Sequence, residues 1–409
     1  MATPSSTAGH LLELIRTGQA GTRGELQSLT GLSRSTVGQR LDQLFAAGWL
    51  ASTPGQLSTG GRPSLRLAFD PGHAAVLAAD LDTTHARAAV LDLAGAVLAE
   101  HDGELRVADG PEAVLDTLAG WFADLLAATG VPAPRVCGVG LSLPGPVDFA
   151  SGLVIRPPIM PGWDGYPIGE RLQRALAGRA GTDPRVPVLT DNDANLMAFG
   201  EQRDGWPDCT TFVLVKVSTG IGAGVVIDGQ VFRGVDGGAG DLGHIRLHDR
   251  PDARCMCGSY GCLAAVASGR AVAGQLAGLG VAAESGTDVR ALLDDGHPDA
   301  VRLAREAGQR VGEVLATAVT LLNPGVLMIA GDLAETHFLT GIRELLYQRA
   351  LPRSTRSLQI VTSRLGDRAA LKGATAMVVD HLYAPEQADV RLAALVGAPA
   401  LRAPAPSQE

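Results

Sequence analysis

Three of the five cysteines of this chain fall within eight residues, in the stretch CMCGSYGC. Cys255, Cys257 and Cys262 follow His244 closely, so three thiolates and one imidazole are available to a single centre. Four sulfur and nitrogen ligands of this kind are typical of a closed tetrahedral zinc site. A disulfide and a group of buried thiols are the alternatives. We expect a metal site with these four ligands, and His248 is a substitute for His244.

The composition bounds the type of protein that surrounds this cluster. A chain of 409 residues with 46% hydrophobic and 19% charged residues is typical of two or three globular domains. No apolar run approaches the roughly 18 residues of a membrane span, and the first residues do not resemble a secretory signal. We therefore expect a cytoplasmic protein without a membrane anchor. Disulfides are rare in that compartment, which favours metal binding by clustered cysteines.

The charge is distributed unevenly. The whole chain carries a formal charge of −9, yet residues 1–70 carry +2 and the rest carries −11. A small basic segment on an acidic body suggests that only the basic segment contacts an anion.

Residues 8–47 show the pattern of a helix-turn-helix. Leucines at helical spacing are followed by a turn at Gly31 and a second helix over residues 33–47, whose Val37, Leu41 and Leu44 would face a core. Polar residues at the start of such a helix are of the types that contact bases and phosphates in a major groove. The candidate DNA contacts on this helix are Ser33, Arg34, Ser35, Thr36, Gln39 and Arg40.

Two short strand-like pieces follow and predict a wing. Between them the sequence GGRP places Arg62 on a flexible glycine pair, a form suited to a narrow minor groove. The first 70 residues are therefore predicted to be a winged helix-turn-helix DNA-binding domain, with a helical protein-interaction domain as the alternative.

From Ala74 onward, strand patterns alternate with helical patterns, which predicts an α/β body. We assign residues 71–395 to this body and residues 396–409 to a flexible tail, because the tail has a composition that favours disorder. The two cysteines outside the cluster, Cys137 and Cys209, lie in strand-like pieces, and we expect them to be buried.

The body carries several motifs in order: GVGLSLPGPVD, LTDNDANLMAFGE, STGIGAGVVIDGQVFRG, GGAGDLGHIRL, CMCGSYGCL and ALKGATA. These motifs resemble those of the ROK family, which is named for repressors, open reading frames and kinases. The resemblance implies an actin-like ATPase fold of two α/β lobes over residues 74–385. The preceding helix-turn-helix, followed by STGGRPS, is similar to the transcription-factor branch of that family.

The resemblance also assigns roles to individual residues. It implies that His244, Cys255, Cys257 and Cys262 hold a structural zinc ion. It places Asp193 at the position of the base that takes a proton from the sugar hydroxyl in the kinases. A turn that only caps the following helix is the alternative for Asp193. The implied sugar contacts are Gly145, Asn192, Asp193, Asp241 and His244, and His244 would serve both metal and sugar.

The chain also departs from the kinase pattern. The family's kinases have an acidic-x-Gly-Gly-Thr loop near ATP, whereas this chain has DLDTTH over residues 80–85. The loss of both glycines and the added carboxylate of Asp82 oppose a polyphosphate. The family's glutamate before Gly-His is shortened to Asp241, and the glutamate after GCL is replaced by Ala264. A second glycine-rich turn, residues 218–224, is intact, and either a phosphate site or a β-hairpin would explain it.

The sequence thus predicts a sugar-responsive transcriptional regulator, in the first place a repressor of carbohydrate metabolism genes, that has lost phosphotransfer. We expect it to bind double-stranded operator DNA as a homodimer or higher oligomer, and to respond to a sugar or sugar phosphate that closes the two lobes. An active sugar kinase with an appended DNA-binding head is the main alternative. A DNA-binding scaffold without a ligand is another.

Overall fold

A computed structural model describes residues 7–54 and 65–397. Arg62 and the last twelve residues of the predicted tail lie outside this range. The described chain divides into two compact units. Unit 1 holds residues 7–54, 65–75, 92–96 and 378–397, and unit 2 holds residues 76–91 and 97–377.

Unit 1 contains the helix-turn-helix that the sequence predicts. Gly31 ends the second helix with a φ of 69°, and the Ser33 hydroxyl accepts a hydrogen bond from the Thr36 amide at the start of the third. Two antiparallel strands of the wing follow, paired from Leu50 with Phe69 onward. The elements of unit 1 are α1 (Ala8–Arg16), α2 (Arg23–Thr30), α3 (Arg34–Ala46), β1 (Leu50–Pro54), β2 (Leu65–Phe69), the 3-10 turn η2 (Pro71–His73) and α14 (Pro385–Gly397).

Helix α14 packs against α1 at the other end of the chain. The Gly9 amide donates a hydrogen bond of 2.8 Å to Asp389 Oδ1. A Cβ atom on Gly9 would lie 2.1 Å from the carbonyl oxygen of Pro385, so only glycine allows the two helices to approach so closely. An ion pair of 2.6 Å between Arg16 and Asp380 adds a second link between the first and last segments.

An aromatic cluster completes the core of unit 1. Tyr383 is fully buried, and its ring meets Trp49 and Phe69 edge to face, with ring centroids 5.2 and 5.1 Å apart. His73 Nε2 lies 2.6 Å from the Tyr383 hydroxyl. The guanidinium of Arg391 stacks 4.6 Å from the Tyr383 ring. The core of the helix-turn-helix unit therefore includes residues from the C-terminal end of the chain.

Unit 2 is built on two five-stranded sheets that share one strand order. The first sheet runs β5-β4-β3-β6-β9, and the second runs β12-β11-β10-β13-β14. If the strands of each sheet are renumbered along the chain, both orders read 3-2-1-4-5, so the same topology occurs twice. The strands are β3 (Ala75–Leu81), β4 (His85–Asp92), β5 (Val97–Glu104), β6 (Val136–Leu143), β9 (Val188–Asn192), β10 (Thr211–Val217), β11 (Ile221–Ile227), β12 (Gln230–Val231), β13 (Val326–Ala330) and β14 (Gln359–Thr362).

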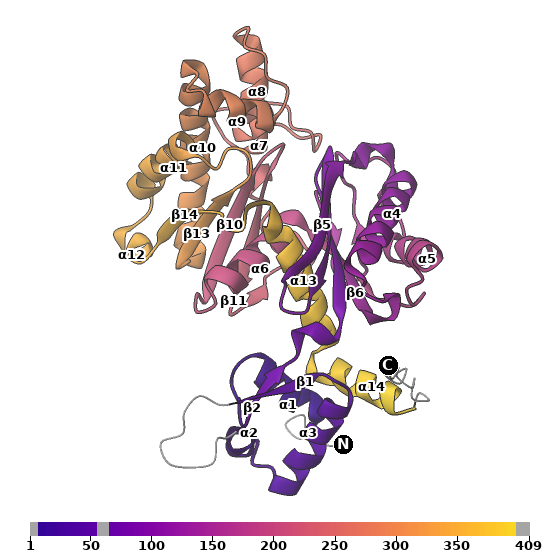
Figure 1. The fold of residues 1–409 in the computed structure, drawn as a ribbon. Coiled ribbons are helices and arrows are strands. Elements are labelled where there is room, and N and C mark those ends of the chain that lie inside the picture. The colour runs from indigo at the N-terminus through magenta and orange to yellow at the C-terminus, as the bar shows by residue number, and fades with distance from the viewer. Residues whose placement is uncertain (1–6, 55–64, 398–409) are drawn as a thin grey trace. The chain divides into compact units, whose positions relative to one another are not determined.

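Helices α6 and α13 lie between the two sheets (Figure 1). A Cβ on Gly373 would lie 1.9 Å from the Leu196 carbonyl oxygen, and one on Gly200 would lie 2.2 Å from that of Ala369, so glycines let these helices touch. The helices of this unit are α4 (Pro111–Thr129), α5 (Ile168–Ala180), α6 (Asp193–Gly205), α7 (Ala264–Ala267), α8 (Gly269–Gly278), α9 (Gly286–Asp294), α10 (Pro298–Leu322), α11 (Thr336–Arg349), α12 (Pro352–Thr355) and α13 (Ala369–Leu382), the last of which continues into unit 1.

Short elements complete the structure. They are the two-stranded ribbon β7 (Val147–Asp148) and β8 (Leu153–Val154) and the 3-10 turns η3 (Val107–Asp109), η4 (Ala133–Arg135), η5 (Leu242–His244) and η6 (Gly366–Arg368). The duplicated sheets with helices between them form the predicted actin-like fold of two lobes.

Two minor expectations fail. Cys137 lies in β6 but is partly exposed, and Cys209 lies in the turn before β10 rather than in a strand.

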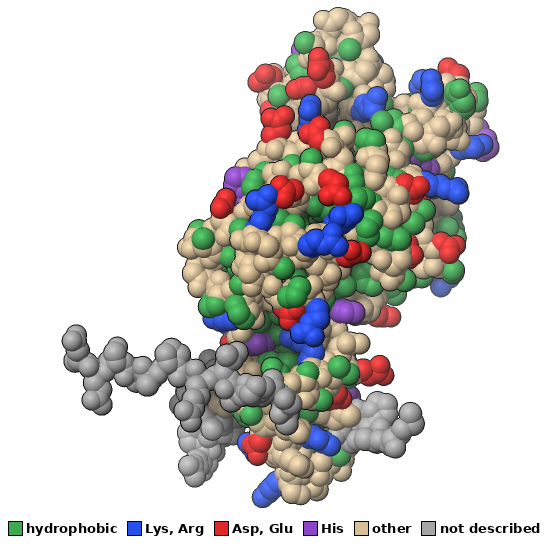
Figure 2. Space-filling model, turned by 90° about the vertical axis from the view of Figure 1, so that its right-hand side faces the viewer, with side chains coloured by type: hydrophobic (Ala, Val, Ile, Leu, Met, Phe, Trp, Pro, Cys, Tyr) green, Lys and Arg blue, Asp and Glu red, His purple; other side chains and the backbone are tan. Residues whose placement is uncertain are grey.

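Of the residues that the structure describes, none belongs to a helix with the length and hydropathy needed to cross a membrane. Acidic and basic side chains are interspersed on the face of the molecule shown in Figure 2. An ion pair of 2.6 Å between Arg179 and Asp116 links α5 to α4.

Candidate functional site

The centre of unit 2 contains an ion pair that the sequence analysis did not anticipate. Lys216 on β10 extends its ammonium to 2.6 Å from Asp193 Oδ2, at the first residue of α6. The other carboxylate oxygen of Asp193 accepts a hydrogen bond from the Ala194 amide at 2.8 Å. Both side chains are nearly buried, at 13% and 12% exposure. A protein group thus already contacts each oxygen of the predicted base.

The loop that replaces the kinase glycine motif lies beside this pair. It is a tight turn between β3 and β4, in which the Asp82 amide bonds the His85 carbonyl and the Thr83 amide bonds Asp82 Oδ1. Asp82 Oδ2 lies 3.5 Å from Lys216 Nζ. Asp80 accepts a hydrogen bond from the Ser142 hydroxyl on β6. Lys216 therefore joins the second sheet to carboxylates at the end of β3 in the first.

The pKa values in this cluster follow from burial and charge. Burial raises the pKa of Asp80 to about 6, although Lys216 and the Ser142 hydroxyl oppose the shift. The attraction of Lys216 lowers the pKa of Asp82. Burial alone would lower the pKa of Lys216, but the carboxylates of Asp193, Asp82 and Asp80 hold it well above its ordinary value. Lys216 is therefore a permanent cation among three carboxyl groups.

The predicted sugar contacts Gly145 and Asn192 lie together. Asn192 Nδ2 donates to the Gly145 carbonyl at 3.1 Å, while Asn192 Oδ1 caps α6 by accepting from the amides of Ala194 and Asn195. The cap of α6 is therefore Asn192 and not Asp193, for which a capping turn was the alternative interpretation. Its neighbour Asp191 is buried and is held by the guanidinium of Arg233, with Nη2 at 2.6 Å.

Asp241 and His244 lie in a segment that runs along β11. The Ala223 amide bonds the Gly240 carbonyl at 2.9 Å, and a Cβ on Gly240 would lie 1.9 Å from the Ala223 carbonyl oxygen. Asp241 and His244 are both exposed and bracket the turn η5. Both side chains therefore lie on the surface of the second lobe.

The glycine-rich turn of residues 218–224 joins β10 to β11. The Ser218 amide closes it on the Gly220 carbonyl at 3.0 Å. Gly224 has a packing role, because a Cβ there would lie 2.2 Å from the Ala194 carbonyl oxygen. A Cβ on Gly220 would meet nothing within 4 Å. The hairpin interpretation therefore explains Gly224, while the surface of the turn at Gly220 is open.

The four predicted metal ligands come together. One donor atom from each of His244, Cys255, Cys257 and Cys262 can be chosen so that all four lie within 4.8 Å of one another. His244 Nδ1 is 3.8 Å from Cys255 Sγ, and Cys257 Sγ is 3.8 Å from Cys262 Sγ. Thiolates bound at ~2.3 Å to a tetrahedral ion lie about 3.8 Å apart, so the donor set fits such an ion. His248 is not part of the group.

In unit 1, the polar residues of α3 divide into two sets. Ser33, Arg34, Ser35 and Gln39 are exposed, whereas Thr36 and Arg40 are half-buried. The Ser33 hydroxyl lies 2.8 Å from that of Ser35 and 2.9 Å from that of Thr36, so these three also stabilise the helix start.

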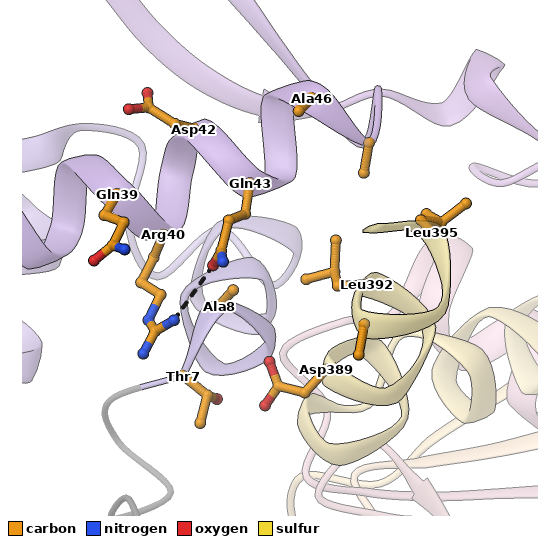
Figure 3. Close-up of a pocket in the computed structure, with 12 residues that line it drawn as sticks. Thr7, Ala8, Gln39, Arg40, Asp42, Gln43, Ala46, Asp389, Leu392 and Leu395 are labelled. Atoms are coloured by element: carbon orange, nitrogen blue, oxygen red, sulfur yellow. Dashed lines mark hydrogen bonds between the residues drawn. The ribbon is translucent and has the colours of Figure 1, made fainter. Parts of the chain in front are cut away.

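Arg40 points into a groove of about 980 Å³ between α3 and α14 (Figure 3). Its guanidinium donates to Gln43 Oε1 at 3.4 Å, and Asp389 and Leu392 of α14 line the same groove. The end of α14 is therefore close to the side of the predicted recognition helix.

Comparison with known proteins identifies the family. The ROK family model matches residues 76–381, and the chain belongs to that family. A putative xylose repressor of Caldicellulosiruptor sp. (strain Rt8B.4) is 28% identical over 397 residues, covering 91% of this chain and 95% of the relative.

Two solved structures extend the comparison. A ROK family transcriptional regulator, described as a homologue of the E. coli MLC protein, superposes with a TM-score of 0.78 at 26% identity, covering 95% of this chain and 99% of that one. A ROK family glucokinase from Streptomyces griseus, in complex with glucose and AMPPNP, has a TM-score of 0.61 at 27% identity and covers 74% of this chain and 99% of its own. The regulator therefore matches both units, whereas the glucokinase matches about the length of the body.

Proposed function

We propose that this protein is a sugar-responsive transcriptional repressor of carbohydrate metabolism genes. The observation that carries the proposal is that one chain contains both a winged helix-turn-helix and a kinase-type body. In that body the carboxylate of Asp193 forms an ion pair with Lys216. The similarity to a putative xylose repressor and to a ROK transcriptional regulator over more than nine-tenths of the chain supports it.

The DNA-binding surface is assigned to the start of α3. Arg34, Ser35 and Gln39 are exposed there, and a helix of this kind contacts bases through its N-terminal residues. Ser33, Thr36 and Arg40 complete the candidate set, the first two also holding the helix start and the last lying against Gln43. Arg62, in the predicted wing, lies outside the described residues. One such head reads only a half-site, so we expect a dimer on a two-fold operator.

The effector site is assigned to the cleft between the lobes. Gly145, Asn192, Asp193, Asp241 and His244 are its candidate contacts. His244 has Nδ1 towards the cysteine cluster, which leaves Nε2 for the sugar. The thiolate-rich donor set fits a structural zinc ion, held by His244, Cys255, Cys257 and Cys262. Zinc would fix the segment that carries His244 and stabilise the fold around it.

Regulation would act as a shift between populations of open and closed bodies. A sugar that contacts both lobes favours the closed form, since it gains contacts there that the open form lacks. The change in the body then alters how paired heads fit the two half-sites. The direction of the response, release from DNA, follows from the proposed role as a repressor.

The test uses the full-length protein and a binding site selected from a random library of double-stranded DNA. Footprinting at one fixed salt concentration should show a protected two-fold site, with affinity reduced on addition of an effector sugar. Arg34→Ala and Gln39→Ala should lose preference for that site, whereas Arg185→Ala, an exposed arginine of unit 2, should keep it. No selected site, or one unaffected by the α3 variants, contradicts the proposal.

An active sugar kinase is the second candidate. The open glycine turn at Gly220 and the similarity to a glucokinase solved with glucose and AMPPNP favour it. The turn at Asp82 and the Lys216 ion pair oppose it. Sugar-dependent release of ADP by the parent protein with magnesium, abolished in Asp193→Asn, would establish this candidate instead.

A further inference from the structure

The Lys216 ammonium lies between carboxylates that come from different parts of unit 2. It contacts Asp193 at 2.6 Å and Asp82 at 3.5 Å, and it comes from the opposite sheet to Asp82. We propose that Lys216 and the carboxylates around it make the effector site selective for an unphosphorylated, uncharged sugar. This inference rests on the proposed function, because it names the chemical class of the effector.

Lys216 engages the carboxylate that would act as the base in a kinase. A kinase base must accept the proton of the attacking hydroxyl in a short hydrogen bond. In Asp193 the Ala194 amide contacts one oxygen and the Lys216 ammonium contacts the other. A carboxylate held by a full positive charge is a poor proton acceptor, because protonation would break the ion pair inside a nearly buried site. Both carboxylate oxygens of Asp193 are therefore in contact with protein groups.

The charges around Lys216 repel a phosphoryl group. Asp80, Asp82 and Asp193 face the single ammonium. The pKa of Asp80 is about 6, raised by burial, so this carboxyl is mostly ionised at neutral pH. The cluster then carries net negative charge, while a sugar phosphate brings a charge of about −1.5 to −2. Arg290 donates a hydrogen bond to the backbone carbonyl of Asp332. The carboxyl group of Asp332 is a further acidic group that interacts with Asp82.

The same groups suit a neutral sugar. Carboxylate oxygens accept hydrogen bonds from hydroxyls, and the amide of Asn192 can donate or accept them. A neutral hydroxyl is not repelled by the carboxylates, because it carries no net charge. Asp241 and His244, exposed on the second lobe, are the remaining candidate contacts. These side chains therefore favour a polar, uncharged ligand over an anionic one.

The test compares matched pairs on the full-length protein by calorimetry and thermal shift. The pairs are D-xylose with D-xylose 5-phosphate, D-glucose with D-glucose 6-phosphate, and N-acetylglucosamine with its 6-phosphate. For the pair that binds, the free sugar should bind at least about tenfold more tightly than its phosphate, the effect of one repulsive charge contact in such a site. Equal or tighter binding of the phosphate overturns the inference and leaves the repressor proposal intact. Failure of every sugar and every phosphate to bind overturns the proposed sensor, and the inference with it.

Charge variants identify the origin of the selectivity. Asp80→Asn/Asp82→Asn removes two negative charges from the cluster and should reduce the preference for the free sugar at least about fivefold. Glu170→Gln/Asp183→Asn removes two exposed negative charges elsewhere in unit 2 and should leave the preference unchanged. If the double variant does not fold, Asp82→Asn alone provides the test, because its amide oxygen can still accept the hydrogen bond of the Thr83 amide. It should also reduce the preference for the free sugar. An unchanged preference in Asp82→Asn contradicts the assignment.

Discussion

The ammonium of Lys216 and the carboxylate of Asp193 form a nearly buried ion pair with an N–O distance of 2.6 Å. Lys216 lies in the middle of the second sheet, and Asp193 begins the helix that packs between the two sheets. The pair therefore links the central strand of the second sheet to the helix that follows β9 of the first.

Replacing Lys216 with methionine should destabilise the protein by about 3 kcal/mol or more, because it leaves the Asp193 carboxylate buried without its partner. The Lys216→Met/Asp193→Asn double variant should recover most of this loss, since it removes the charge together with its partner. Urea unfolding followed by circular dichroism measures both. A Lys216→Met protein as stable as the parent would show that the ion pair does not form.

Asp80→Asn should make the protein more stable at pH 7.5, by up to about 3 kcal/mol, and have little effect near pH 4. The pKa of Asp80 in the folded protein, raised by burial to about 6, exceeds its ordinary value of 3.8. The folded state thus keeps a proton that the unfolded chain releases, so this carboxyl lowers stability as pH rises through that window. Unfolding curves at both pH values, with the exposed Asp208→Asn as control, test the difference. Equal stability of variant and parent at pH 7.5 contradicts it.

Cys257→Ser should abolish stoichiometric zinc and lower the melting temperature, because an oxygen is a poorer ligand and three remaining donors cannot close the tetrahedron. Cys209→Ser, whose thiol bonds a backbone carbonyl outside the cluster, should retain the metal. Metal analysis by mass spectrometry after dialysis decides the question. Absence of zinc in the parent protein, or full retention in Cys257→Ser, would refute the site.

Gly9→Ala should destabilise unit 1 by roughly 1–3 kcal/mol and weaken DNA binding, since its Cβ would lie 2.1 Å from the Pro385 carbonyl oxygen. Gly24→Ala is the matched control, because a Cβ there meets nothing within 4 Å and alanine favours a helix. Hydrogen exchange of residues 8–54 and operator affinity are the measurements. Similar exchange rates in the two variants would show that α14 does not pack on α1 in solution.

The sequence predicted what depends on local patterns. Val37, Leu41 and Leu44 repeat at helical spacing, and all three are buried, as expected for the core face of α3. The alternating strand and helix patterns predicted only an α/β body, and the actin-like fold was implied by the resemblance of its motifs to the ROK family.

The Lys216 contact could not be read from spacing, since 23 residues separate it from Asp193 and 134 separate it from Asp82. One signal was present. Lys216 is one of only two lysines in the chain and interrupts an apolar strand, FVLVKV. A charge in a buried strand requires a partner, so this position pointed to an ion pair even before its partners could be named.

The packing of α14 on α1 also escaped prediction. The hydrogen bond from Gly9 to Asp389 joins residues 380 positions apart, and neither segment carries a motif that points to the other. The sequence analysis placed residues up to 395 in the sugar-binding body. That boundary stays a prediction, and the contacts of Tyr383 and Asp389 lie with the residues of unit 1.

The burial of Tyr383 between Trp49 and Phe69 has a consequence for synthesis on the ribosome. The helix-turn-helix is synthesised before residues 378–397, and its core lacks the Tyr383 ring and α14 until these residues have been translated. A nascent chain that has not yet reached these residues therefore has an incomplete core in unit 1. A stop codon that removes residues 378–397 would thus weaken the part of the molecule that was synthesised first.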